Sequence, residues 1–203
     1  MRTRLSPHQR KAQILAKARE LFRMRGYAKT EMEDIRQACA LSRGGLYHHF
    51  GSKSEILDAI AAEEIKKLCS LIEGPDPSPI ETLLAAGSSH LGADPGILPA
   101  FNKRAEKAAY CASLEQAVSK ILHPVLAKAL AKSVRADIDP EHVAELFLTV
   151  NERINRRALL GEWTEAQAAS FAATALKALA PLMKDAIGLK PLIHQFEKKG
   201  TGK

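Results

Sequence analysis

The sequence has no run of about 20 apolar residues, the length that a membrane-spanning helix needs. No apolar stretch follows the basic N-terminal segment, which is not the pattern of a secretory signal peptide. Its three cysteines, Cys39, Cys69 and Cys111, are odd in number and widely spaced, so they form neither a disulfide framework nor a C-x-x-C metal site. We therefore expect a cytoplasmic protein with buried, reduced thiols and no membrane partner.

Signatures of catalysis are also missing. H-E-x-x-H, G-x-S-x-G, Gly-rich phosphate loops and paired Cys/His ligand spacings do not occur. His142 and Glu145 lie three residues apart on a predicted helix, but no further ligand nearby completes a metal site. We expect neither an enzyme nor a protein with a metal or cofactor.

Aromatic residues make up only 5% of the chain, and alternating runs of β-branched residues are nearly absent. Alanine, a strong helix former, is abundant. Apolar residues recur three and four positions apart, as at Ile14, Leu15, Ala18, Leu21 and Phe22, which is the spacing of one helical face. The sequence therefore predicts an all-α fold.

Positive charge is concentrated at one end of the chain. Residues 1–53 hold 12 lysines and arginines against 4 acids, whereas the whole chain has a formal net charge of +7. The remaining three quarters are therefore close to neutral. A basic block of this kind attracts a polyanion, and nucleic acid and an anionic membrane surface are the two natural candidates.

Four helices are predicted in this part of the chain, at about 7–25, 31–39, 43–49 and 53–72. Each follows a residue that commonly caps a helix N-terminus, namely Ser6, Thr30, Ser42 and Ser52. The second and third helices are short and separated by a turn of about three residues, which is the helix-turn-helix arrangement. In that arrangement the second helix of the pair lies in the DNA major groove and the first braces it.

Side chains that donate hydrogen bonds remain on the outer faces of these helices once the apolar positions point inward. They are Arg36, Ser42, Arg43, Tyr47, His48 and Lys53. Donors of this kind suit phosphates and base edges. A basic membrane-surface helix is the weaker interpretation, because the first helix lacks tryptophan and has few large apolar residues.

One ordered pattern runs through this segment: Gly26, Tyr27, Thr30, Asp34, Ile35, the sequence SRGGLYHHF at 42–50, Ser52, Lys53 and Leu57. Over roughly residues 8–60 it resembles the DNA-binding domain of the TetR family. The resemblance implies a homodimeric, sequence-specific transcription repressor that a small-molecule effector releases from a palindromic operator. The alternative is a helical dimer or effector-binding module whose helix-turn-helix domain, here called the reading head, no longer binds DNA.

The resemblance also implies roles for single residues. Thr30 would cap the bracing helix and could reach a phosphate, while Ser42 and Arg43 would open the recognition helix. Gly44 would let the backbone approach DNA closely, and Tyr47 and His48 would face phosphates or base edges. Lys53 would bind a phosphate beside the positive N-terminus of the fourth helix.

Two positions depart from the family pattern. Ala40 stands in the turn where glycine is usual, which is only moderately unfavourable if the backbone there is not strongly left-handed. Arg36 stands where a small residue is common, so its side chain either points to solvent or adds a DNA contact.

The remaining chain is expected to be a second helical domain. We place the helix-turn-helix domain at 8–68, an effector-binding and dimerisation domain at 69–190, and a basic, frayed tail at 191–203. Residues 74–79 are rich in proline and glycine and mark a seam. Helices are predicted at 80–91, at 140–160 and at 164–187. Between the first two, the region after the loop at 92–96 is predicted to be helical to about residue 137, with a kink or break at Pro124.

Two apolar stripes on the last two of these helices are candidates for a four-helix dimer interface. They comprise Val143, Leu146, Phe147, Val150 and Ile154 on one helix, and Ala169, Ala172, Ala173, Leu176, Leu179 and Leu182 on the other. Core packing within one chain is the alternative. Candidate residues for an effector pocket combine apolar surface with a polar handle: His90, Phe101, Tyr110, Phe147, Asn151 and Trp163.

Overall fold

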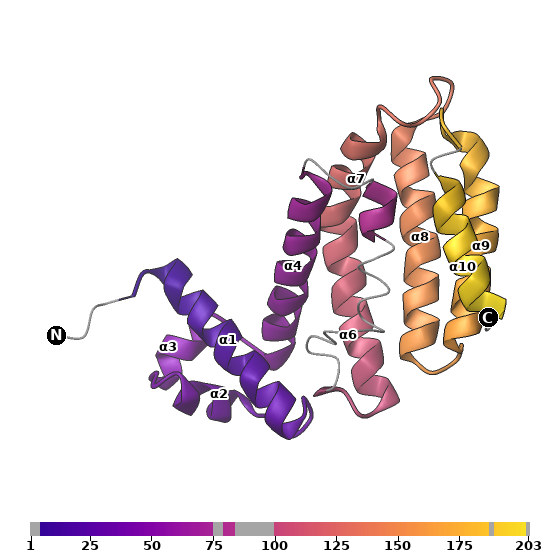
Figure 1. Ribbon diagram of the computed structural model, residues 1–203. Helices are drawn as coiled ribbons and strands as arrows, with labels where there is room; N and C mark the ends of the chain where they lie inside the picture. Colours follow the sequence, from indigo (N-terminus) through magenta and orange to yellow (C-terminus); the bar gives the residue numbers. More distant parts are fainter. Residues whose placement is uncertain (1–4, 75–78, 84–99, 187–188, 202–203) are drawn as a thin grey trace.

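A computed structural model describes residues 5–74, 79–83, 100–186 and 189–201, and it is all-α (Figure 1). The helices are α1 (Pro7–Arg25), α2 (Met32–Ala38), α3 (Arg43–Tyr47), α4 (Lys53–Ile72), α6 (Arg104–Ala117), α7 (His123–Leu130), α8 (Pro140–Leu159), α9 (Glu165–Leu179) and α10 (Lys190–Thr201). Among the described helices, none is both long and apolar enough to cross a bilayer.

Local capping chemistry fixes where several helices begin. The Ser6 hydroxyl accepts a hydrogen bond from the backbone N–H of Gln9, whose side chain accepts one from the N–H of Ser6. Thr164 and Gln167 repeat this reciprocal pair at the start of α9. These bonds satisfy donors that the first helical turn leaves unpaired.

Two hydrophobic cores meet within α4. Ile56, Leu57 and Ile60, in its first half, pack into a core with the buried side chains of α1–α3, whereas Ala61, Ile65, Cys69 and Ile72 belong to a core built with α6–α9. Figure 1 shows α1, α2 and α3 gathered around the start of α4, α6 running along α4 on its other side, and α8, α9 and α10 beyond α6. The predicted boundary at 68/69 falls inside this continuous helix.

The expected interruption near Pro124 takes the form of a π-helical turn at Val118–Leu122, between α6 and α7. Proline has no N–H to donate, and its ring clashes with the carbonyl four residues earlier, here that of Lys120. A wider turn before Pro124 relieves both conflicts and allows α7 to begin with the proline in its first turn.

The apolar stripes predicted for dimerisation are mostly buried within the chain. Val143, Phe147 and Ile154 are at most 8% exposed, as are Ala169, Ala172, Ala173, Leu176 and Leu179. Leu146 is 46% exposed, and Phe171, which the prediction did not include, is 39% exposed. Packing within one chain therefore accounts for most of both stripes, and Leu146 and Phe171 are the large apolar side chains left exposed on α8 and α9.

The tail differs from expectation. Residues 190–201 form α10, which lies along α9 (Figure 1). Leu192, Ile193 and Phe196 repeat at helical spacing and are half-buried against the neighbouring core. This apolar face stabilises the segment in spite of its glycine and lysines.

Candidate nucleic-acid interface and internal cavity

The turn between α2 and α3 is a complete Schellman motif. The N–H of Ala40 donates to the carbonyl of Gln37, and the N–H of Leu41 donates to that of Arg36, at 3.0 and 3.1 Å. Ala40 has a φ of 51°, so an alanine occupies the left-handed position that favours glycine. Alanine is therefore more unfavourable at this position than the sequence suggests, and Ala40 is a strained residue within the helix-turn-helix.

Helix α3 is short, and buried side chains on its inner face fix it to the core. Leu46 is fully buried and Phe50 is 3% exposed, and both pack in the core with Ile35 and Phe22. The Ser42 hydroxyl caps the helix by accepting from the N–H of Gly45 at 3.0 Å. These contacts fix which face of α3 points outward.

The outward face carries most of the predicted DNA contacts. Arg43, Gly44, Tyr47 and His48 are all exposed, as is Ser42. The guanidinium of Arg43 lies over the Tyr47 ring, 5.8 Å from its centroid. A Cβ added at Gly44 would meet nothing within 4 Å, so the fold itself does not require glycine there.

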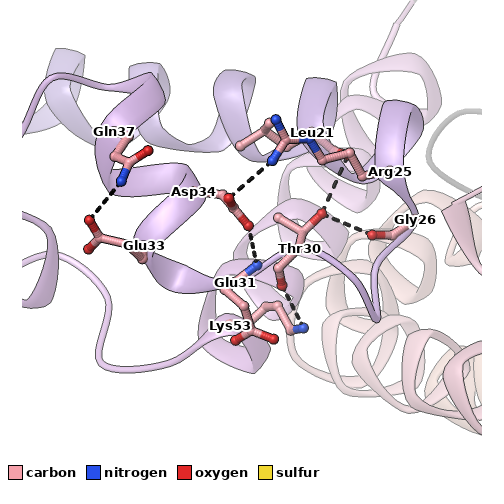
Figure 2. A network of polar contacts seen from close by, with 9 residues as sticks. All are labelled: Leu21, Arg25, Gly26, Thr30, Glu31, Glu33, Asp34, Gln37 and Lys53. Carbon is pink, nitrogen blue, oxygen red and sulfur yellow. Dashed lines mark hydrogen bonds and ion pairs between the residues drawn. The ribbon is translucent and has the colours of Figure 1, made fainter.

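Thr30 does not have its predicted place. It is fully buried, and its hydroxyl donates to the carbonyl of Gly26 at 2.9 Å (Figure 2). The N-cap of α2 is Glu31, whose N–H donates to the Asp34 carboxylate at 2.8 Å. The predicted cap is off by one residue, and burial leaves the Thr30 side chain no surface on which to meet a phosphate.

Lys53 lies at the first position of α4 but turns back to the loop before α2. Its ammonium donates to the carbonyls of Tyr27 and Thr30 at 2.9 and 2.7 Å, and it lies 4.7 Å from the centre of the Tyr27 ring. Figure 2 shows it reaching the backbone of Thr30. Lys53 thus ties α4 to the segment between α1 and α2.

Arg36 is likewise engaged within the domain. Its guanidinium binds both carboxylate oxygens of Glu33, at 2.6 and 2.8 Å, and donates to the carbonyl of Leu41 at 2.6 Å. The bond with Arg36 holds the pKa of Glu33 down, to about 2, with help from Gln37. In this conformation Arg36 braces the turn that leads into α3.

A cavity of about 200 Å³ lies in the other core, lined by α4, α6, the π turn and α8. Two of the predicted pocket residues, Tyr110 and Asn151, line it. Phe101, Phe147 and Trp163 do not: Phe101 stacks on Tyr110 from the reading-head side, Phe147 is buried in the core, and Trp163 packs on Phe171. His90 lies outside the described residues.

Sequence reasoning missed the charged lining of this cavity. Glu115, Glu145, Glu152, Arg156 and His123 all border it. Three of them could have been found from the sequence, because Glu145, Glu152 and Arg156 repeat at helical spacing along α8, beside its apolar face. Glu115 and His123 come from other elements, so no spacing in the sequence joins them to that stripe.

The N-terminal domain gives the decisive comparison. Residues 14–60 match the family model described as "Bacterial regulatory proteins, tetR family". The N-terminal domain of this protein is therefore of the TetR type. The TetR-type head thus comprises α1–α3 and the start of α4, which are the elements that present the outward face of α3.

The curated relatives are HTH-type transcription regulators that match a similar length of this chain. The HTH-type transcriptional repressor Rv1474c of Mycobacterium tuberculosis is 36% identical over 62 residues, which are 30% of this chain and 33% of the relative. The sequence match therefore spans about a third of the relative's length.

Solved structures extend the likeness to the whole fold. A TetR-family transcriptional regulator of Pectobacterium atrosepticum is 25% identical with a TM-score of 0.55, over 91% of this chain and 99% of its own. Salmonella enterica GusR is 22% identical with a TM-score of 0.58, over 89% and 98% of the two chains, and shows the same fold.

Proposed function

We propose that this protein is a homodimeric, sequence-specific transcription repressor that a small molecule releases from a palindromic operator. The observation that carries the proposal is the outward face of α3. It presents Arg43, Tyr47 and His48 from a helix that the buried Leu46 and Phe50 fix in place. A regulator of this kind acts on chromosomal DNA, so we propose a cytoplasmic location.

In the proposed complex, α3 lies in the major groove. Arg43 has the reach and the paired donors to read a guanine, while Tyr47, His48 and the capped Ser42 bind phosphates or base edges. Gly44 leaves the exposed start of α3 without a side chain, so the backbone can approach the groove closely. Lys53 and Arg36 support the head from within, through the bonds described above.

A palindromic operator needs two heads, and hence a dimer. The exposed Leu146 on α8 and Phe171 on α9 are the side chains that we place in the interface. Replacing both with lysine would introduce charge into it. In sedimentation experiments, the expected result is a monomer that keeps its helical content and binds DNA poorly.

A chain of aromatic contacts connects the cavity with the head. Tyr110 lines the cavity and stacks on Phe101, with ring centroids 5.0 Å apart; Phe101 contacts Tyr27 at 5.3 Å, and Tyr27 contacts Phe22 at 5.1 Å. The Tyr110 hydroxyl also donates to Glu64 of α4 at 2.6 Å. We propose that a ligand that displaces Tyr110 shifts the population of head positions and so lowers DNA affinity.

Selection of bound duplexes from a random pool, followed by a salt titration of the winner, tests the function. The expected result is a palindrome whose half-sites lie on one face of the duplex, bound with a steep salt dependence. Recovery of no enriched sequence, with only weak salt-sensitive binding, would favour the alternative of a helical dimer with a vestigial head.

A further inference from the structure

The size of the cavity limits what it can hold. Its volume is about 200 Å³, and an apolar cavity of roughly 150 Å³ admits a benzene ring. Eight aliphatic side chains line it: Ile65, Leu68, Leu83, Leu114, Val118, Leu122, Leu148 and Leu159. The ligand that fits is therefore small, with an apolar body about the size of one ring and a short substituent.

The charges on the lining do not balance. Three carboxylates border the cavity, from Glu115, Glu145 and Glu152, against the single guanidinium of Arg156. Arg156 is already paired with Glu115. The imidazole of His123 lies 3.4 Å from Glu145 and also 3.4 Å from Glu141.

Glu152 is the carboxylate that this arrangement leaves without a counter-ion. Within the described ranges it forms no ion pair at 4.0 Å or less, although it lies beside Glu115 at the same wall. Partial burial, followed by the negative charge of Glu115, raises the pKa of the Glu152 carboxyl, and Arg156 only partly opposes this. Glu152 is at the same time exposed, so a ligand in the cavity can reach its carboxylate.

We propose that the effector is a small organic cation, whose apolar ring fills the cavity and whose ammonium group binds between Glu152 and Glu115. The inference rests on the proposed function, since it takes this cavity as the effector site. An ammonium there would supply the missing positive charge, while the aliphatic walls would bury the ring. An anionic ligand would have to displace Glu115 from Arg156 and would meet the remaining carboxylates.

Three probes of nearly equal size and different charge test the proposal by titration calorimetry on the full chain without DNA. They are benzyltrimethylammonium, the neutral 2-methyl-1-phenylpropan-2-ol and the anionic 3-phenylpropanoate. The expected order of affinity is cation, then neutral, then anion, with about a tenfold preference for the cation over the neutral probe, the size of one partly screened charge pair. Equal affinity for the cation and the neutral probe would overturn the proposal.

Glu152→Gln sharpens the test, with Glu73→Gln as the matched control. Glu73 is an exposed C-cap residue of α4 that does not line the cavity, so both variants lose one negative charge. Glu152→Gln should lower the affinity for the cation about tenfold and leave the neutral probe unchanged, whereas Glu73→Gln should change neither. The melting temperature of the ligand-free Glu152→Gln protein should be no lower than that of the parent, because an unfavourable charge has gone.

The remaining outcomes also decide the matter. Tightest binding by 3-phenylpropanoate, lost in Arg156→Gln, would make Arg156 the anchor and the effector an anion. Binding of none of the three probes would remove this ligand class from the cavity. Operator binding by the same ligand-free sample is measured in parallel, so failure of the ligand assignment is separated from failure of the proposed function.

Discussion

The reading head and the cavity differ in how their residues are gathered. In the head, Ser42, Arg43, Gly44, Tyr47 and His48 come from one short helix, so their spacing in the sequence already places them on one surface. The cavity takes side chains from Ile65 to Leu159, on elements that meet only in the folded chain. Local spacing therefore reveals a surface built on one element, and it conceals a site built between several.

The two regions also differ in how their charges are satisfied. In the head, the ammonium of Lys53 and the guanidinium of Arg36 are bound to carbonyl and carboxylate oxygens at 2.6–2.9 Å. At the cavity wall, Glu152 has no such partner among the described residues. The cations of the head are thus held by the protein itself, whereas the carboxylate of Glu152 remains accessible at the cavity.

The prediction with the largest effect tests whether the head can unfold while the domain that holds the cavity stays folded. Phe50→Ala should destabilise the head by about 3–5 kcal/mol, because Phe50 is buried and its removal leaves a void beneath α3. DNA binding should be lost, while calorimetry still detects the cation in the cavity. Tyr47→Ala is the control: its ring is 45% exposed, so DNA affinity should fall with little change in melting temperature. Loss of both activities in Phe50→Ala would show that the two regions fold as one unit.

Lys53→Met separates a structural from an electrostatic role in the head. Removing the ammonium leaves the carbonyls of Tyr27 and Thr30 without a donor, which should cost about 2 kcal/mol in thermal unfolding and weaken binding to all DNA alike. The slope of log affinity against log salt should stay the same, because the ammonium is already bound. A slope that falls by about 1 would instead assign Lys53 to a phosphate.

Arg43→Ala tests whether α3 reads bases. The expected loss is about 1–3 kcal/mol of discrimination between the operator and a variant with one base pair changed, measured in competition binding. Arg36→Ala is the control, because Arg36 braces the turn through Glu33 and Leu41. It should lower stability while keeping the preference for the operator. Unchanged discrimination in Arg43→Ala would contradict the base-reading role.

Gly44→Ala sets stability against function at one residue. No atom obstructs a methyl group there, and alanine is the better helix former, so α3 should gain up to about 1 kcal/mol. The same methyl group should weaken operator binding if the backbone at Gly44 lies against DNA. A gain in both the melting temperature and the DNA affinity would show that the groove contact lies elsewhere on α3.

Ala40→Gly should have the smallest effect and the opposite logic. Ala40 has a φ of 51°, so glycine should relieve strain, and after the entropic cost of glycine in the unfolded chain the net gain should be about 0.5 kcal/mol in chemical denaturation. DNA contacts should not change, since the turn keeps its two Schellman hydrogen bonds. A loss of stability would mean that the flexibility of glycine in the unfolded chain outweighs the strain.

Sequence reasoning succeeded where the cause was local. The helix starts at Ser6, Ser42 and Ser52 and the break at Pro124 follow from caps and from proline chemistry, and the structure confirms them. The predicted N-cap of α2, Thr30, is wrong by one residue. The Thr30 hydroxyl donates to the Gly26 carbonyl instead, and Glu31 is the N-cap. Competing hydrogen bonds of this kind depend on the packing of α1, which the spacing of Thr30 and Glu33 does not encode.

Tertiary packing explains the other differences. The tail is predicted to fray because it is basic and ends in glycine, yet residues 190–201 form α10, whose apolar face lies along α9 and is half-covered there. The stripe of alanines on α9 is predicted to meet a second chain, but neighbours within the same chain bury it. Composition gives the amphipathic face in such cases, but only the folded chain identifies which surface covers it.

The helix α4 has a consequence for how such proteins can be recombined. Its first half is fixed in one core and its second half in the other, with the change between Ile60 and Ala61. One residue inserted at that junction would turn everything beyond it by about 100°. A head grafted from a relative must therefore keep the number of residues in α4, so that its two halves still face their own cores.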